Sequence, residues 1–320
     1  MKTIGFSRCI FLSWYCELGT CTFCFRSTTK HKIKFAENAK RTVESVLCEA
    51  LVGEKLGLHH EFLTGGYGIF EFDEIVKIAG YVSEIYGEKL WVNLGVLGKK
   101  QMEKLMPYVE GIYASCETVN EQVQKDVCPG KPILPYSKML INALDIGMKT
   151  AMTIVIGLGE TKNDFETLAK FIEDHKLTRI TFYALKPVKG TPFTESPDEE
   201  YYAWWIKQTK EKFPNLKVIA GLTPKNPGYV KFLLEAGVDE ITKFPAIKKF
   251  NSEESQYIEK QIQDAGFNYE FTLTKMPDLD WDKEVDKLSY PDKDALKKKL
   301  KQYVDKMKVN IEQKTKECSN

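Results

Sequence analysis

Short apolar stretches rich in β-branched residues recur eight times along the chain, with amphipathic stretches between them. Continuous apolar strands that alternate with helices are typical of a parallel sheet covered by helices, because both faces of such a sheet are buried. Eight such units favour an α/β fold of the (β/α)8 TIM-barrel type, with a doubly wound open sheet as the alternative. The predicted strands cover residues 3–12, 61–66, 90–95, 111–117, 150–157, 179–185, 217–222 and 239–244.

Helical periodicity is clearest in four of the intervening stretches. Each places its apolar side chains on one face, as a helix that covers a sheet must do. In the last of them, Asn226 is in place for an N-cap, Pro227 for the first turn and Gly237 for the position after the end. The predicted helices cover residues 42–57, 73–87, 164–175 and 226–237.

The alternation ends near residue 250, which predicts a barrel over residues 1–250 and a small C-terminal α/β extension packed on it over residues 251–320. Within the extension we expect a helix over 251–266, a strand over 268–276 and a wrapping loop over 277–294. The Lys-rich stretch that follows places its apolar residues on one helical stripe and is interpreted as a solvated amphipathic helix. The stripe consists of Leu296, Leu300, Tyr303, Met307 and Ile311.

The formal net charge is +1, so no overall basic field would attract nucleic acid. No apolar run approaches the roughly 18 residues of a membrane span. Arg8 interrupts the first apolar stretch and no small-residue cleavage site follows, which argues against a signal peptide. We therefore expect a cytoplasmic protein with no nucleic-acid and no membrane partner.

Cys16, Cys21 and Cys24 form a C-x4-C-x2-C array directly after the first predicted strand. In a reducing cytosol, clustered thiols bind metal or do chemistry. Structural zinc needs four ligands, and a [4Fe–4S] cluster usually takes four thiolates, so three leave one iron open to another ligand. In a barrel this loop lies at the carboxyl end of the strands, where active sites are found. The alternatives are a structural zinc site and an electron-transfer cluster.

The array resembles the C-x3-C-x-Φ-C motif of the radical S-adenosylmethionine (SAM) superfamily, in which Φ is aromatic and is Phe23 here. The first spacing is four residues instead of three. The resemblance implies that the three thiolates hold a [4Fe–4S] cluster and that SAM chelates the fourth iron. It further implies reductive cleavage of SAM to methionine and a 5′-deoxyadenosyl radical, which abstracts hydrogen from an unactivated carbon.

Two strand ends add to this resemblance. Gly65 and Gly66 end the second strand, where the family has a GGE-like turn, although Tyr67 replaces the acidic residue. Ser115 and Glu117 end the fourth strand and resemble the S-x-E element of the biotin synthase-like branch. The resemblance implies that the glycines approach SAM and that Glu117 holds its ribose or its amino group. From the residues alone, a plain turn and a rim salt bridge are the alternative interpretations.

The fifth and sixth strands complete the resemblance, which spans roughly residues 5–245. Gly157 and Glu160 belong to the sequence VIGLGET, which resembles the family's I-x-G-x-x-E element and the sulfur-inserting lipoyl and biotin synthases. Leu185, in YALKP, resembles the segment that lines the adenine. The implied cofactor-binding residues are thus Phe23, Gly65, Gly66, Ser115, Glu117, Gly157, Glu160 and Leu185.

Cys116 and Cys128 lie on the fourth βα connection, and we expect both to face the mouth of the barrel, at the carboxyl ends of the strands. There they could hold a second iron–sulfur cluster. Two buried small hydrophobes are the alternative. Within the family we favour sulfur insertion by a lipoyl synthase-like component, on a small-molecule or protein-bound lipoyl-type substrate. Ferredoxin or flavodoxin is the expected electron donor, and a second radical SAM subunit a possible partner. A maturase in hydrogenase-cofactor biosynthesis and a non-enzymatic Fe–S or zinc carrier are the alternatives.

Overall fold

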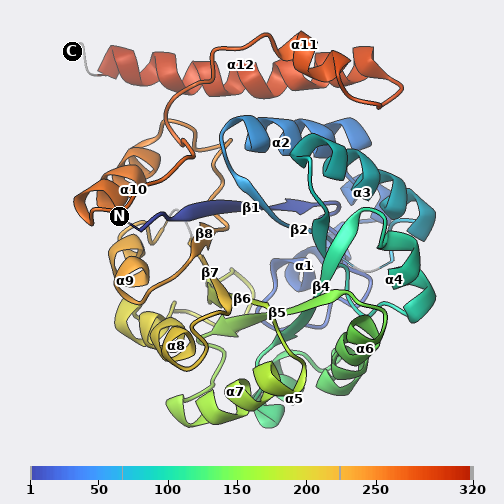
Figure 1. Ribbon diagram of the computed structural model, residues 1–320, viewed down its shortest axis with the longest axis vertical. Helices are drawn as coiled ribbons and strands as arrows, with labels where there is room; N and C mark the ends of the chain where they lie inside the picture. The colour runs from blue at the N-terminus through green and yellow to red at the C-terminus, as the bar shows by residue number, and fades with distance from the viewer. Residues whose placement is uncertain (1, 67, 223–224, 318–320) are drawn as a thin grey trace.

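The computed structural model describes residues 2–66, 68–222 and 225–317, with side chains to Ile311. Its centre is a closed barrel of eight parallel strands in the order of the sequence, as predicted (Figure 1). The strands are β1 (Gly5–Phe11), β2 (His59–Thr64), β3 (Leu90–Asn93), β4 (Val109–Glu117), β5 (Lys149–Ile156), β6 (Arg179–Ala184), β7 (Lys217–Gly221) and β8 (Glu240–Thr242).

Helices surround the barrel, and the longest lies across its outside beyond α2 (Figure 1). Short 3-10 turns, η1 (Lys30–Lys32), η2 (Ala36–Ala39) and η3 (Lys162–Asp164), accompany them. The helices are α1 (Phe25–Thr29), α2 (Val43–Lys55), α3 (Phe72–Tyr86), α4 (Lys99–Leu105), α5 (Glu121–Val127), α6 (Ile133–Asp145), α7 (Phe165–Asp174), α8 (Glu199–Lys212), α9 (Tyr229–Glu235), α10 (Glu253–Asp264), α11 (Trp281–Asp286) and α12 (Lys293–Glu317).

Strand β1 closes the ring by pairing with β8 only at its amino end, where Gly5 faces Glu240 and Phe6 faces Ile241. Beyond that point β1 continues beside β2, as far as Phe11 opposite Thr64. The rest of the β1–β8 seam is spanned by a side chain, because Arg8 Nη1 donates to the carbonyl of Phe244 at 3.0 Å.

The buried side chains divide into two layers, as strand alternation requires. The outer layer packs between the strands and the helices and includes Phe6, Ile10 and Leu63. The inner layer fills the barrel and includes Cys9, Tyr113 and Tyr183. Residues that point inward at the carboxyl ends of the strands therefore line the mouth of the barrel.

Two features of the C-terminal extension differ from the prediction. Residues 268–276 form no strand, and in the described chain Asn268 makes a single parallel bridge to Thr3. A closed barrel offers no free sheet edge that this segment could join. Residues 277–294 contain helix α11, whose N-cap Asp280 accepts from the backbone N–H of Asp282 at 3.2 Å.

The predicted amphipathic helix is confirmed as α12, which buries Leu296, Leu300 and Met307. It packs on α2, where the Tyr303 hydroxyl lies 3.0 Å from Ser45 Oγ and the thiol of Cys48 contacts the Leu296 carbonyl. No helix in the described residues is both long and apolar enough to cross a membrane.

Candidate active site

The cysteine loop joins β1 to α1 at the carboxyl end of the barrel. The Cys21–Cys24 segment is a tight turn, in which Cys24 N–H donates to the Cys21 carbonyl at 3.2 Å. Ser27 Oγ donates to the same carbonyl at 2.6 Å, and Thr22 N–H donates to the Val127 carbonyl at 2.9 Å. These hydrogen bonds fix the turn and present partly exposed thiols at the mouth.

The glycine turn after β2 packs directly against this loop. A Cβ atom on Gly66 would lie 1.6 Å from the carbonyl oxygen of Tyr15 and 2.6 Å from the Cα of Cys16. Gly65 has ordinary space, since its Cβ would come no closer than 3.6 Å to Leu12. Gly66 is therefore required so that the second strand end can support the backbone that carries Cys16. Tyr67 lies outside the described residues.

The donor set at this loop fits an iron–sulfur cluster. Thiolates are the ligands that hold such clusters, and here three thiols stand on one hydrogen-bonded loop. Among the described residues, no three Cys, His, Asp or Glu side chains converge as ligands of one metal ion. In a cluster each cysteine binds a different iron, so its thiolates lie farther apart than ligands of one ion. The three-thiol donor set therefore fits an iron–sulfur cluster with one iron left without a protein ligand.

The thiol of Cys128 lies in hydrogen-bond contact with Cys21. This contact lowers the pKa of Cys21, against the effect of its burial, and raises the pKa of Cys128. Burial raises the pKa of Cys24. Cys128 packs in the inner layer beside Cys21, whereas Cys116 belongs to the outer layer. The expectation that both thiols face the mouth therefore holds for Cys128 and is wrong for Cys116.

Glu117 ends β4 in a left-handed conformation, with a φ of 66°. Its carboxylate accepts from the ammonium of Lys131 at 2.6 Å. Although burial alone would lower the pKa of Lys131, the charge of Glu117 raises it well above the ordinary value. The neighbouring Ser115 hydroxyl contacts the side-chain oxygen of Asn93. The mouth thus contains a buried ion pair between Glu117 and Lys131, and Lys131 belongs to none of the sequence motifs.

Glu160 is held by its own loop. Its two carboxylate oxygens accept from the backbone N–H groups of Gly157 at 2.8 Å and Leu158 at 2.9 Å. Burial raises its pKa. Gly157 has a φ of 103°, which only glycine adopts readily, so the VIGLGET sequence builds a rigid turn after β5. Glu160 shapes the mouth through the backbone of this turn.

An apolar wall faces the cysteine turn. Leu158 and Leu185 are buried in the inner layer, and the partly buried Phe23 and Cys21 pack against that layer. Phe23 and Leu185 therefore belong to the same packed cluster. The cofactor-binding roles predicted for these residues, and for Gly65, Gly66, Ser115, Glu117, Gly157 and Glu160, stay predictions.

The interior below the mouth is polar. Glu61 is fully buried, and its carboxyl accepts from the Tyr183 hydroxyl at 2.7 Å and contacts the Thr242 hydroxyl. Lys243, which follows β8, places its ammonium 4.4 Å from the centre of the Tyr183 ring. Neither Glu61 nor Lys243 belongs to a motif, so only the strand assignment could have indicated this group from the sequence.

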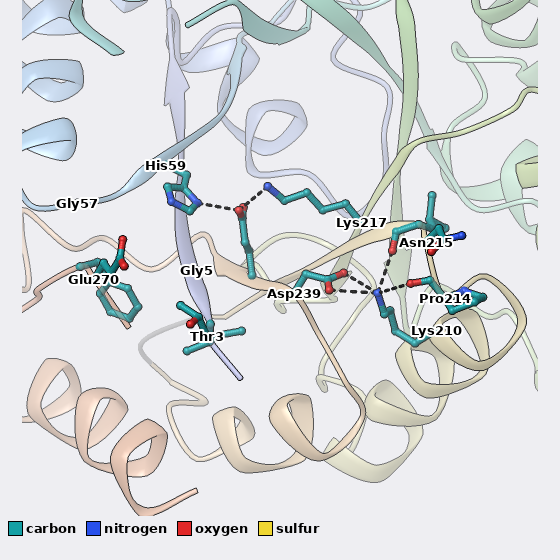
Figure 2. Close-up of a pocket in the computed structure, with 14 residues that line it drawn as sticks. Thr3, Gly5, Gly57, His59, Lys210, Pro214, Asn215, Lys217, Asp239 and Glu270 are labelled. Atoms are coloured by element: carbon teal, nitrogen blue, oxygen red, sulfur yellow. Dashed lines mark hydrogen bonds and ion pairs between the residues drawn. The ribbon is translucent and has the colours of Figure 1, made fainter. Parts of the chain in front are cut away.

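A cavity of about 370 Å³ lies at the opposite, amino-terminal end of the barrel. Its cations are paired: Glu240 accepts from His59 at 2.7 Å and from Lys217 at 2.5 Å, while Lys210 pairs with Asp239 at 2.9 Å (Figure 2). In barrel enzymes this end serves stability, and the carboxyl end carries the chemistry. We therefore assign the cavity to the scaffold.

The fold and the cysteine loop together define a TIM-type barrel built around an iron–sulfur site. Residues 12–172 match the model of the Radical SAM superfamily. A relative from Methanocaldococcus jannaschii, an uncharacterised protein, is 35% identical over 294 residues, which are 90% of this chain and 81% of the relative. The chain belongs to the radical SAM superfamily.

More distant similarities agree with this membership. The biotin synthase of Thermotoga neapolitana is 26% identical over 159 residues, which cover 48% of this chain and 57% of that protein. The chain therefore matches about half the length of the biotin synthases. The crystal structure of a methylornithine synthase superposes with a TM-score of 0.70 at 16% identity and covers 84% of each chain, which shows a shared fold.

Proposed function

We propose that this radical SAM enzyme holds a [4Fe–4S] cluster through Cys16, Cys21 and Cys24 and leaves the fourth iron to SAM. The observation that carries the proposal is the cysteine loop at the carboxyl end of β1, which rests on Gly66. A non-enzymatic carrier would require a fourth protein ligand, for which Cys128, in contact with Cys21, is the candidate.

When bound, the cluster and SAM supply one-electron cleavage of a C–S bond, giving a radical that abstracts hydrogen from an unactivated carbon. The chain provides the surroundings. Phe23, Leu158 and Leu185 belong to one apolar cluster, and we expect this apolar wall to limit the access of water to the mouth. Glu117 and Lys131 neutralise each other at 2.6 Å, so this pair adds no net charge beside the cysteine turn.

The finer reaction remains a proposal. Sulfur insertion of the lipoyl synthase type draws support from the VIGLGET sequence and from the distant similarity to biotin synthases. A second cluster held by both Cys116 and Cys128 gains no support from their separation into different packing layers. Maturation of a hydrogenase cofactor is the alternative reaction, and the substrate is a small molecule or a lipoyl-type group on a protein.

The reaction needs one electron from outside the chain. We propose ferredoxin or flavodoxin as its source, because both are one-electron carriers of low potential. A second radical SAM subunit is a further possible partner. A small chemical reductant can replace the carrier in the test of the reaction itself.

The test is anaerobic reconstitution, followed by dithionite and SAM, with 5′-deoxyadenosine as the measured product. We expect about four irons per chain for one cluster and about eight for two. Replacing Cys24 with Ala should abolish product, while Cys48→Ala, a buried thiol under α12, serves as the matched control. A wild-type protein with a full cluster and no product would point instead to the carrier function.

A further inference from the structure

Lys243 points into the barrel against the strand alternation. Thr242 is the last residue of β8 and faces inward, because its hydroxyl contacts Glu61. The next side chain of a regular strand would face outward. Lys243 instead has a φ of 67°, in the left-handed region that a lysine rarely occupies. This turn returns its side chain to the inside, where Nζ lies 4.4 Å from the Tyr183 ring centre.

No carboxylate of the described chain pairs with this ammonium. None of the ion pairs within 4.0 Å among the described residues includes Lys243. The Glu61 carboxyl already accepts a hydrogen bond from the Tyr183 hydroxyl and contacts the Thr242 hydroxyl. The Glu117 carboxylate already forms an ion pair with Lys131. Burial raises the pKa of Glu61, which weakens it as a counter-charge.

The surroundings of Lys243 make an unpaired ammonium costly. The side chain is half-buried, and burial lowers its pKa, with nearby Cys9, Glu117 and Glu61 acting in the opposite direction. The Tyr183 ring face compensates in part through a cation–π contact. A strained backbone and a poorly paired charge are typical of a site that a ligand completes.

We propose that Lys243 binds a carboxylate of the substrate inside the barrel mouth. The inference rests on the proposed function, which places the reaction at this end of the barrel. A carboxylate is favoured over a phosphate because a single ammonium matches a single negative charge. Lys131 pairs with Glu117, while Arg26 donates to the Ser13 carbonyl at 3.0 Å and stacks on the rings of Phe11 and Phe25.

The position of Lys243 also indicates the orientation of the substrate. The cysteine turn and the wall of Phe23, Leu158 and Leu185 lie in one packed cluster that also includes Tyr183. A ligand anchored by its carboxylate at Lys243 would cross the Tyr183 ring and extend an apolar part toward that wall. The substrate class is therefore a carboxylic acid with an apolar carbon chain.

The test uses the reconstituted holoenzyme with SAM bound and measures binding by calorimetry. The probes are hexanoate and its neutral isostere hexanamide. We expect Lys243→Met to weaken hexanoate binding by about tenfold or more, because it removes a charge-assisted hydrogen bond. Lys243→Arg should restore most of the affinity, and hexanamide should bind equally to all three proteins. Iron content and thermal melting check that each variant folds.

Any one of four results would overturn the assignment. The carboxylate site is ruled out if hexanoate fails to bind the wild-type protein, or if it binds equally well to Lys243→Met. A variant that loses affinity for SAM and keeps it for hexanoate would assign the ammonium to the cofactor's carboxylate. Stronger binding of hexyl phosphate than of hexanoate would assign it to a phosphate. Failure of the proposed function is recognised separately, as absence of 5′-deoxyadenosine from wild-type protein with a full cluster.

Discussion

The thiols of Cys128 and Cys21 lie in hydrogen-bond contact with each other. Cys128 follows the end of α5 and Cys21 lies in the loop after β1, so the contact depends on the closed barrel. Hydrogen bonds to the sulfurs of an iron–sulfur cluster help to set its reduction potential. Cys128 is therefore placed to tune the cluster without being one of its three predicted ligands.

Replacing Cys128 with Ala tests this relationship. We expect the variant to keep the iron content of the wild type and to have a lower midpoint potential, because the thiolate charge on Cys21 loses a compensating donor. The measurement is an EPR-monitored redox titration. Cys116→Ala, a buried thiol in the outer layer, is the control and should leave the potential unchanged. A loss of about four irons in Cys128→Ala would show that Cys128 is a ligand.

Gly66→Ala should displace the cysteine loop. The new methyl group would stand 1.6 Å from the Tyr15 carbonyl, so the backbone beside Cys16 must move. Overpacking of this kind costs about 1–3 kcal/mol, and we expect most of the iron and of the 5′-deoxyadenosine to be lost. Gly65→Ala is the matched control, since its Cβ meets nothing closer than 3.6 Å. Equal iron content in the two variants would refute the packing argument.

Glu240 gives the barrel a pH dependence on the acid side. Burial acts to raise the pKa of Glu240, but hydrogen bonds and charges from His59 and Lys217 lower it to about 2 from 4.5. A carboxylate with a lowered pKa stabilises the folded state above the pKa of the unfolded chain. That contribution is present at pH 7 and is lost as the pH falls from 4.5 toward about 2.

Glu240→Gln tests that contribution. The shift corresponds to a loss of about 3 kcal/mol in the free energy of unfolding at neutral pH. Urea denaturation at several pH values should show wild type and variant converging below pH 4.5. SAM cleavage should persist in the folded variant, because Glu240 lies at the end of the barrel away from the cysteines. A constant difference at all pH values would contradict the assignment.

Helix α12 should stabilise the barrel through its apolar stripe. Leu300 is 1% exposed, so Leu300→Ala is expected to lower the free energy of unfolding by about 2–5 kcal/mol. Lys301→Ala, an exposed neighbour, should change it by less than about 0.5 kcal/mol. Urea denaturation compares the two. Similar values for both variants would indicate that α12 is not packed on the barrel in solution.

The barrel could be predicted because its signal is local. Each strand is a short apolar run, and each covering helix has its own periodicity. The packing layer of a residue such as Val155 or Leu168 can therefore be inferred from its near neighbours in the sequence, without knowledge of distant contacts. Strand alternation in the sequence also contradicts the expectation that Cys116 faces the mouth. Tyr113 and Ser115 share the inward face of β4, which leaves Cys116 on the outward face with Ala114.

The site was predictable only where a motif marks it. The loop with Cys21 follows from spacing and from its place after the first strand. The partners of Glu117 and Cys21 depend on how α5 and the segment after it pack on the barrel, and no short pattern encodes that. Lys243 was missed for a further reason, because its left-handed backbone reverses the side on which a strand residue would lie.

The incomplete seam between β1 and β8 has a consequence for motion in the molecule. Ladder pairing joins these strands only near Gly5 and Phe6, so farther along the seam side chains connect them. Ser7 contacts Glu240 and Thr242, and Arg8 is bonded to the Phe244 carbonyl on one side and to Glu49 on the other. One guanidinium thereby couples the strand that carries the cysteine loop to the residue after Lys243. A change in the seam at Arg8 would therefore displace the loop of the three proposed cluster ligands and the proposed carboxylate-binding Lys243 together.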